Sequence, residues 1–264
     1  MSFLKSLSGI LSMTSCVRAL VPTISGYTLT WSDEFIGTAN SLPSTANWII
    51  DTGTQYEGGP ANWGTGETQV YTSKPENLAL SGNGTLVITP IKHNAKISLR
   101  PKERRCASKL VSPCRTYLAL KQLTAIGEFD IMENVNGINK VWGVIHCDVN
   151  PGGVCKETDG LSSNLKCPGT SCQGNFHTYT LEVDRSATPE TLKWMVDETI
   201  FHAITETLLS ATIWANAVHQ GHFVLINLAM GGAFPNNNHG GSTPLATTVS
   251  GKPLRVEYVA VYNG

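Results

Sequence analysis

Three acidic residues lie close together in the otherwise apolar stretch GEFDIMEN, residues 127–134. Carboxylates on a half-buried strand repel one another and lose hydration, so chemistry is the usual reason for placing them there. In a regular strand, side-chain alternation turns Glu128 and Asp130 to one face and Glu133 to the other. A one-residue bulge near Met132 would return Glu133 to the shared face. We therefore predict such a bulge.

Paired carboxyl groups about 5–5.5 Å apart are what retaining glycosidases use. In this arrangement Glu128 is the expected nucleophile and Glu133 the expected acid/base. Asp130 can hydrogen-bond one glutamate and, by repulsion, raise the pKa of the other, which keeps that group protonated near neutral pH. The alternative is an exposed edge strand with solvated acids. It is disfavoured by flanking apolar residues that need a buried face: Ile126, Phe129, Ile131 and Val135.

The elements that position these acids are expected to be strands. The chain has 264 residues, 41% hydrophobic and 15% charged, with 25 glycines and 13 prolines that divide it at short intervals. This pattern predicts an all-β, antiparallel, jelly-roll β-sandwich. One helix is expected over 204–216. The predicted strands are 27–31, 48–50, 68–72, 78–81, 85–91, 127–135, 141–147, 176–184, 192–196, 223–230 and 254–262.

The charge balance bears on the partner. The formal net charge is −1 and the isoelectric point is about 6.6. Neither value favours a nucleic acid or an anionic membrane, so a neutral substrate is expected. The chain is also expected to be a monomer. A basic segment between 91 and 121 is read as a solvated loop, with a patch for an anionic partner as the alternative.

The N-terminus and the cysteines predict secretion. Residues 1–19 combine Lys5, a short apolar stretch and small residues before a cleavage point, as in a signal peptide; a disordered leader or a misassigned start is the alternative. Of the seven cysteines, six would remain after cleavage. Two disulfides are expected to brace the loop-like stretch 147–172, since zinc sites usually carry CxxC pairs that this stretch lacks.

The stretch GEFDIMENVNG, residues 127–137, resembles the Glu-x-Asp-x-x-Glu signature of glycoside hydrolase family 16, in a laminarinase-like branch of fungal type. The resemblance makes residues 26–264 the catalytic domain. It extends to further blocks along the chain, namely 27–35, 66–72, 76–78, 176–179, 225–232 and 255–259.

The resemblance implies a concanavalin A-like jelly roll whose concave sheet binds a β-glucan. The implied reaction is retaining endo-hydrolysis of β-1,3 or mixed β-1,3/1,4 bonds, without a cofactor. The alternatives are a non-catalytic glucan-binding or inactive jelly roll, and a cell-wall transglycosylase using the same acids. A structural calcium occurs in the family. The nearest positions here are Glu34, Gly84 and Glu257, but Glu257 replaces the usual aspartate, so no metal is assigned.

Further residues are expected at the substrate. His146 shares a face with Trp142 and is expected to orient Glu128 or Asp130, or else to be a core histidine. The other implied substrate contacts are Asn77, Asn227, Trp63 and Trp142. The alternatives are turn or core hydrogen bonding for the two asparagines and core packing for Trp63.

The chain departs from the family between residues 91 and 126. Relatives carry a Trp-Pro-Ala-Phe-Trp run in a longer block there, whereas this chain has no tryptophan between Trp63 and Trp142. Either one or two core strands are missing or replaced, or the segment is non-coding sequence translated in error. Both readings put the cleft, and with it the activity, in question.

Overall fold

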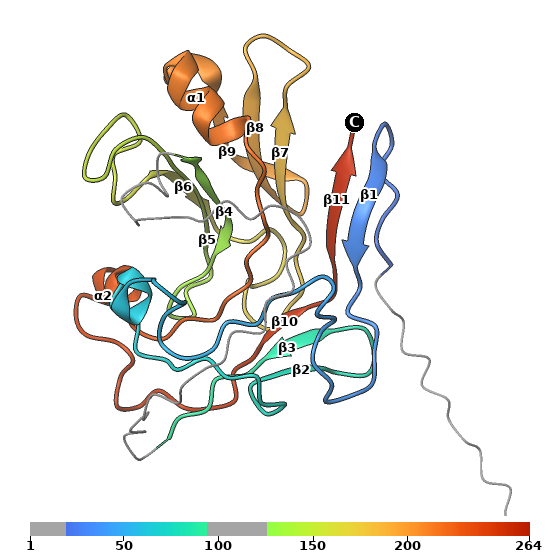
Figure 1. Cartoon of the computed structure of the whole chain (residues 1–264), viewed down its shortest axis with the longest axis vertical. Helices are drawn as coiled ribbons and strands as arrows, with labels where there is room; N and C mark the ends of the chain where they lie inside the picture. The colour runs from blue at the N-terminus through green and yellow to red at the C-terminus, as the bar shows by residue number, and fades with distance from the viewer. Residues whose placement is uncertain (1–19, 94–125) are drawn as a thin grey trace, which may run out of the picture. The chain divides into compact units, whose positions relative to one another are not determined.

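The computed structural model describes residues 20–93 and 126–264, and nearly all of its regular structure is antiparallel β-sheet (Figure 1). The predicted leader and the basic segment fall outside this part of the chain, apart from residues 91–93. The described residues form two units. Unit 1 comprises residues 20–54, 70–93 and 247–264, and unit 2 comprises 55–69 and 126–246.

Unit 1 holds two small sheets. β1 (Thr28–Asp33) pairs with β11 (Val259–Asn263), and β3 (Leu86–Ile88) lies between β2 (Leu78–Leu80) and β10 (Leu254–Val256). The expected strand 254–262 is thus two strands. It changes sheet between β10 and β11, which is how strands turn corners in β-sandwiches.

The expected strand at 48–50 is a loop held by side chains instead. The indole N–H of Trp48 donates to Asp33 Oδ2 at 2.8 Å, and its ring packs against Trp31 and Phe35. These contacts partly bury the aromatic residue without a strand partner. In unit 2, residues 223–230 are also not assigned as a strand, although the Met230 carbonyl accepts a hydrogen bond from the Thr68 amide. The expected strand 68–72 is reduced to an isolated bridge of Tyr71 with Gly53.

Unit 2 contains two three-stranded sheets. The first is β4 (Glu128–Glu133), β5 (Val141–His146) and β6 (Leu161–Leu165). The second is β7 (Tyr179–Asp184), β8 (Thr191–Val196) and β9 (Thr199–Thr205), in chain order. β4, β5, β7 and β8 were expected. β6 and β9 were not, because β6 reads LSSNL within the cysteine-rich stretch, and β9 overlaps the predicted helix.

The two sheets of unit 2 share an apolar core. Ile145 of β5 packs with Leu192, Trp194 and Ile204 of the second sheet, and each of these four side chains is at most 5% exposed. This packing turns the odd-numbered face of β5 toward the core. The opposite face of the first sheet, which carries Trp142 and His146, is therefore available for a site.

The helices of unit 2 are short. The helix expected at 204–216 begins later, at α1 (Ala211–Val218), because Ile204 belongs to β9 and the 3-10 turn η3 (Glu206–Leu208) intervenes. Ser210 caps α1 by accepting the amide of Ile213. The 3-10 turn η1 (Ala61–Gly64) and the helix α2 (Ala233–His239) were not expected.

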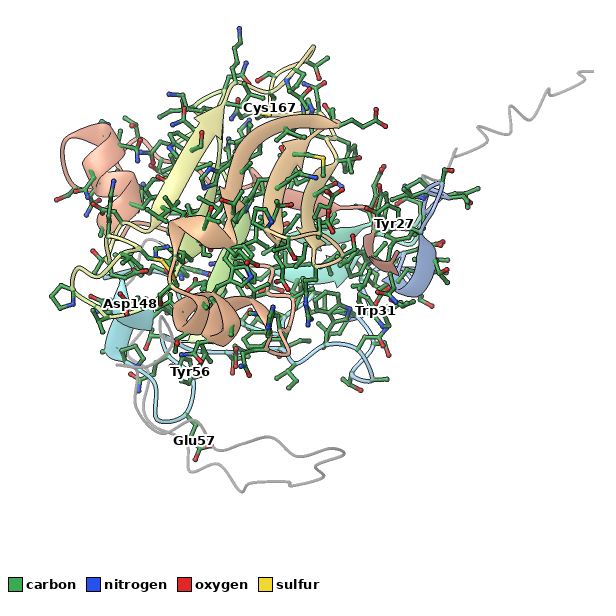
Figure 2. All side chains as sticks on the ribbon, turned by 90° about the horizontal axis from the view of Figure 1, so that it is seen from above. Tyr27, Trp31, Tyr56, Glu57, Asp148 and Cys167 are labelled. Carbon is green, nitrogen blue, oxygen red and sulfur yellow. A yellow bond between two sulfur atoms is a disulfide. The ribbon has the colours of Figure 1, made fainter. Side chains whose placement is uncertain are left out.

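The expectation of two disulfides in residues 147–172 is confirmed. Cys147 bonds Cys155, and Cys167 bonds Cys172. They lie at opposite ends of the β5–β6 hairpin, as the labels Asp148 and Cys167 show in Figure 2. Each bond closes a short loop that has little apolar material of its own. Cys106 and Cys114 fall outside the described residues.

Candidate active site

The predicted bulge is present in β4. Glu128 is paired with His146 and Asp130 with Val144, but Glu133 is paired with Trp142. Residues 131 and 132 together therefore face the single position 143. Directly paired residues of antiparallel strands project to the same face, so all three acids share the face of Trp142 and His146.

Packing on the other side of the sheet holds the bulge. Gly143 leaves space for Trp194, since a Cβ at this glycine would lie 2.6 Å from the indole Cδ1. The indole N–H donates to the Asp130 carbonyl at 3.0 Å. At the start of β4, Gly127 has φ +82° and lies against Ala217 of α1. A side chain at either glycine would displace β4.

The three acids have different surroundings. Glu128 is exposed, while Asp130 and Glu133 are partly buried. Burial, followed by the charges of Glu128 and Glu133, raises the pKa of Asp130 to about 7. Burial also raises the pKa of Glu133, and the charge of Glu128 raises it further while His146 opposes both. Glu128 thus repels Glu133, and the charge of Glu133 in turn helps to raise the pKa of Asp130.

His146 connects Asp130 to a residue that the sequence analysis did not single out. Its Nε2 lies 3.4 Å from Asp130 Oδ2, and its Nδ1 lies 2.8 Å from Oε2 of Glu157. Glu157 is only 6% exposed, and its Oε1 accepts the Cys147 amide at 2.8 Å. The sequence placed Glu157 in a polar loop, CKETDG, where nothing distinguishes a buried acid from a solvated one.

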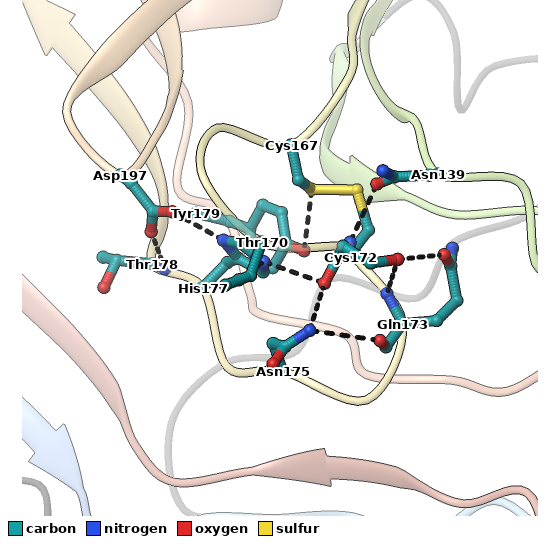
Figure 3. Close-up of polar contacts among 11 residues, drawn as sticks. Asn139, Cys167, Thr170, Cys172, Gln173, Asn175, His177, Thr178, Tyr179 and Asp197 are labelled. Carbon is teal, nitrogen blue, oxygen red and sulfur yellow. Dashed lines mark hydrogen bonds and ion pairs between the residues drawn. A yellow bond between two sulfur atoms is a disulfide. The ribbon is translucent and has the colours of Figure 1, made fainter.

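The turn after Glu133 is held by the loop around the Cys167–Cys172 disulfide. Gln173 donates to Asn134 Oδ1 at 3.2 Å and to the Ile138 carbonyl. Asn139 Oδ1 accepts the Cys172 amide at 2.9 Å (Figure 3). This loop therefore fixes the chain directly beyond the proposed acid.

His177 secures that loop in turn. Its Nδ1 lies 2.5 Å from Asp197 Oδ2, and its Nε2 lies 3.2 Å from the Ser171 carbonyl (Figure 3). Burial would lower the pKa of His177, but the hydrogen bonds to Asp197 and Ser171 raise it overall. The imidazolium form can donate to both acceptors at once.

An aromatic pair stands beside the acids. The Trp142 and Phe234 rings meet edge to face with centroids 5.6 Å apart, and Lys140 Nζ lies 5.3 Å from the Trp142 ring centre. Phe234 belongs to α2, which Asn136 anchors by donating to the Pro235 carbonyl. Phe234 was not predicted; its only sequence signal is its place after Gly231-Gly232.

Comparison with known proteins indicates the chemistry of this face. No family model matches the chain. It is 36% identical to a solved endo-1,3-beta-glucanase from Streptomyces sioyaensis, with a TM-score of 0.79, over 92% of this chain and 99% of that one. The chain belongs to glycoside hydrolase family 16. This membership makes it a glycoside hydrolase with the predicted antiparallel jelly-roll fold, in the laminarinase-like group.

More distant relatives agree with the family. The hydrolase is 28% identical to a beta-glucanase of Rhodothermus marinus, over 89% of this chain and 84% of that protein. It is also 27% identical to glucan endo-1,3-beta-glucosidase A1 of Niallia circulans. That alignment covers 91% of this chain but only 38% of the relative. These relatives are bacterial, so the fungal type stays a prediction.

Three further residues of the hydrolase were predicted to contact substrate, namely Trp63, Asn227 and Asn77. Trp63, in η1, is partly buried with its ring centre 6.3 Å from that of Tyr56. Asn227 is exposed. Asn77 belongs to unit 1, where it accepts from Thr72 and donates to the Thr89 carbonyl. Both ends of its amide thus have partners within unit 1.

Among residues 20–93 and 126–264, no three His, Cys, Asp or Glu side chains form a group suited to a metal ion. No helix in those same ranges has both the length and the apolar composition needed to cross a bilayer.

Proposed function

We propose that this family 16 hydrolase cleaves β-1,3 or mixed β-1,3/1,4 glucan internally, with retention of anomeric configuration. The observation that carries the proposal is the bulge of β4, which gathers Glu128, Asp130 and Glu133 on one face beside His146. The names of the relatives, endo-1,3-beta-glucanase and beta-glucanase, support the substrate class.

The proposed reaction has two steps. In the first, Glu128 attacks the anomeric carbon while Glu133 protonates the departing glycosidic oxygen, forming a glycosyl-enzyme. In the second, Glu133 takes a proton from water, which attacks the same carbon and releases Glu128. The raised pKa of Glu133 suits the first step, because the acid must hold its proton at the working pH.

Trp142 is the proposed sugar platform. The apolar faces of β-linked glucose stack on aromatic rings, and Phe234 and Lys140 fix the orientation of the Trp142 ring. Asn77, Asn227 and Trp63 remain proposed substrate contacts. His146 is proposed to act through Asp130.

The test is hydrolysis of laminarin and lichenan by the full-length chain and by Glu128→Gln, followed as released reducing sugar. We expect the variant to lose at least about 10³-fold in kcat, because it lacks the nucleophile. Product anomers followed by NMR should show retention. A folded wild-type chain no more active than the variant would refute the proposal, and transfer of glucan to added oligosaccharide without net hydrolysis would indicate a transglycosylase.

We further propose that the enzyme acts outside the cell. The two disulfides of unit 2 support an oxidising compartment. The signal peptide at 1–19 and the catalytic domain at 26–264 belong to the same proposal, and cleavage after residue 19 can be checked by N-terminal sequencing of the secreted protein.

A further inference from the structure

Glu157 is a buried acid to which the proposed reaction assigns no task. It lies in the loop after β5, eleven residues beyond His146, with a side chain that is 1% exposed. Burying a carboxylate is costly unless donors compensate it. Here Oε1 accepts the Cys147 amide and Oε2 meets His146 Nδ1, each at 2.8 Å.

The loop holds Glu157 at this point by covalent and backbone bonds. Cys147 and Cys155 close it as a disulfide. Gly152 and Glu157 exchange two backbone hydrogen bonds of 2.7 Å each. Gly160 of the same loop lies close to the histidine, since a Cβ added at this glycine would lie 3.0 Å from His146 Cε1. The carboxylate and the ring are thus confined together.

This confinement decides which nitrogen of His146 faces the acids. A carboxylate is an acceptor, so Nδ1 must carry a proton and donate it to Glu157. Nε2 is then left facing Asp130 Oδ2 at 3.4 Å. When the ring is charged, its Nε2–H group faces an ionised Asp130. When the ring is neutral, the Nε2 lone pair can accept a proton from Asp130.

We propose that Glu157 is a positioning residue that fixes the orientation and protonation of His146 and thereby controls whether Asp130 carries its proton. The inference rests on the proposed function, in which Asp130 lies between the nucleophile and the acid. It adds to that function a relay of Glu157, His146 and Asp130. This relay links the loop closed by the Cys147–Cys155 disulfide to β4.

The charges around the ring agree with this role. Burial would lower the pKa of His146, but its hydrogen bond to Glu157 and the charges of Asp130, Glu157 and Glu128 raise the pKa overall. The loop contributes Glu157 and β4 contributes the other two. A charged His146 lowers the pKa values of both Asp130 and Glu133. Loss of the Glu157 charge should therefore raise the pKa of Glu133.

The first test compares Glu157→Gln with Asp159→Asn, which removes an exposed carboxylate from the same loop. Glu157→Gln should lower kcat about tenfold with KM within about twofold, because the bound substrate is untouched while the acid's setting changes. The alkaline limb of its kcat/KM profile should move to higher pH by about half a unit. Asp159→Asn should match wild type. A folded Glu157→Gln with the wild-type profile would overturn the proposal.

The second test needs no variant of Glu157 to fold. Side-chain ¹⁵N and ¹³C NMR of the full-length wild type, with His146 assigned through His146→Gln, should show a proton on Nδ1 in the neutral ring. It should also show titration above the usual pKa of about 6.5. A neutral ring protonated at Nε2, or an ordinary pKa, would overturn the relay. This readout is independent of glucan hydrolysis, so an inactive wild type would count against the proposed function alone.

Discussion

At the scale of single residues, the site places three neighbouring carboxyl groups in different surroundings. Glu128 is exposed, while burial raises the pKa of Glu133 and raises that of Asp130 to about 7. Two like charges flank Asp130, and His146 offsets them only in part. The fold therefore keeps the middle carboxyl in a setting that disfavours its charge.

This setting should appear in the stability of the protein. The folded pKa of Asp130 lies above its unfolded value of about 3.9, so the folded state binds the proton more tightly. Its stabilising effect is complete below pH 4 and is lost as pH rises through about 7. Asp130→Asn, which mimics the protonated form, should raise the free energy of unfolding at pH 8 by on the order of 2 kcal/mol.

The measurement is urea unfolding of wild type and Asp130→Asn at pH 4 and pH 8. The gain should be much smaller at pH 4, where wild-type Asp130 is itself protonated. Activity should fall in the same variant, because the charge between nucleophile and acid is gone. Equal gains in the free energy of unfolding at both pH values would mean that the charge of Asp130 does not destabilise the folded state.

At the scale of elements, the bulge depends on the strand behind it. Gly143 lies opposite the bulge and Trp194 of β8 fills the space it leaves, so the second sheet fixes the backbone that carries Asp130. The shared face of the acids could be predicted from the sequence. Side chains of a strand alternate with a period of two, so Glu128 and Glu133, five residues apart, share a face only if the strand contains a bulge. The supporting tryptophan could not be predicted, since its partner lies 64 residues away in sequence.

Gly143→Ala tests this support. Its Cβ would lie 2.6 Å from Trp194 Cδ1 and should push the indole away from the Asp130 carbonyl. We expect a loss of about 1–3 kcal/mol in stability and a loss of about 10²-fold in kcat from displaced carboxylates. Thermal unfolding and laminarin hydrolysis measure the two effects.

The matched control is Gly221→Ala, where a Cβ would meet no atom within 4 Å. It should leave both quantities near wild type. Trp194→Phe offers a second view, since it removes the donor to the Asp130 carbonyl together with part of a fully buried ring, and should cost at least about 1–3 kcal/mol. If Gly143→Ala loses less stability than expected and keeps its activity, the bulge does not depend on Trp194.

At the scale of the whole molecule, sequence patterns predicted the fold class, most strands, the disulfide-braced stretch and the shared face of the acids. They failed where burial is decided by distant residues. Trp48 lies in a loop because Asp33 accepts its indole N–H, and β6 is a strand because β5 pairs with it despite its polar residues. Glu157 is the clearest case, because only the folded loop distinguishes it from a solvated acid.

The two disulfides provide the last prediction, because they brace loops of similar size with different links to the site. Closing loops of 8 and 5 residues should stabilise the folded chain by about 2–2.5 kcal/mol each. The double variants Cys147→Ala/Cys155→Ala and Cys167→Ala/Cys172→Ala should therefore lose similar stability in thermal unfolding. Only the first pair holds the loop that delivers Glu157 to His146.

The first double variant, assayed well below its Tm, should accordingly show the lowered kcat and shifted alkaline limb expected for Glu157→Gln. The second should retain a nearly wild-type pH profile, because Gln173 and Asn139 anchor its loop beyond Glu133 without contact to the histidine relay. Equal pH profiles for the two variants would mean that the first disulfide stabilises the enzyme without positioning its histidine. Unequal profiles at equal stability would connect the Cys147–Cys155 bond to the protonation of the carboxyl groups of β4.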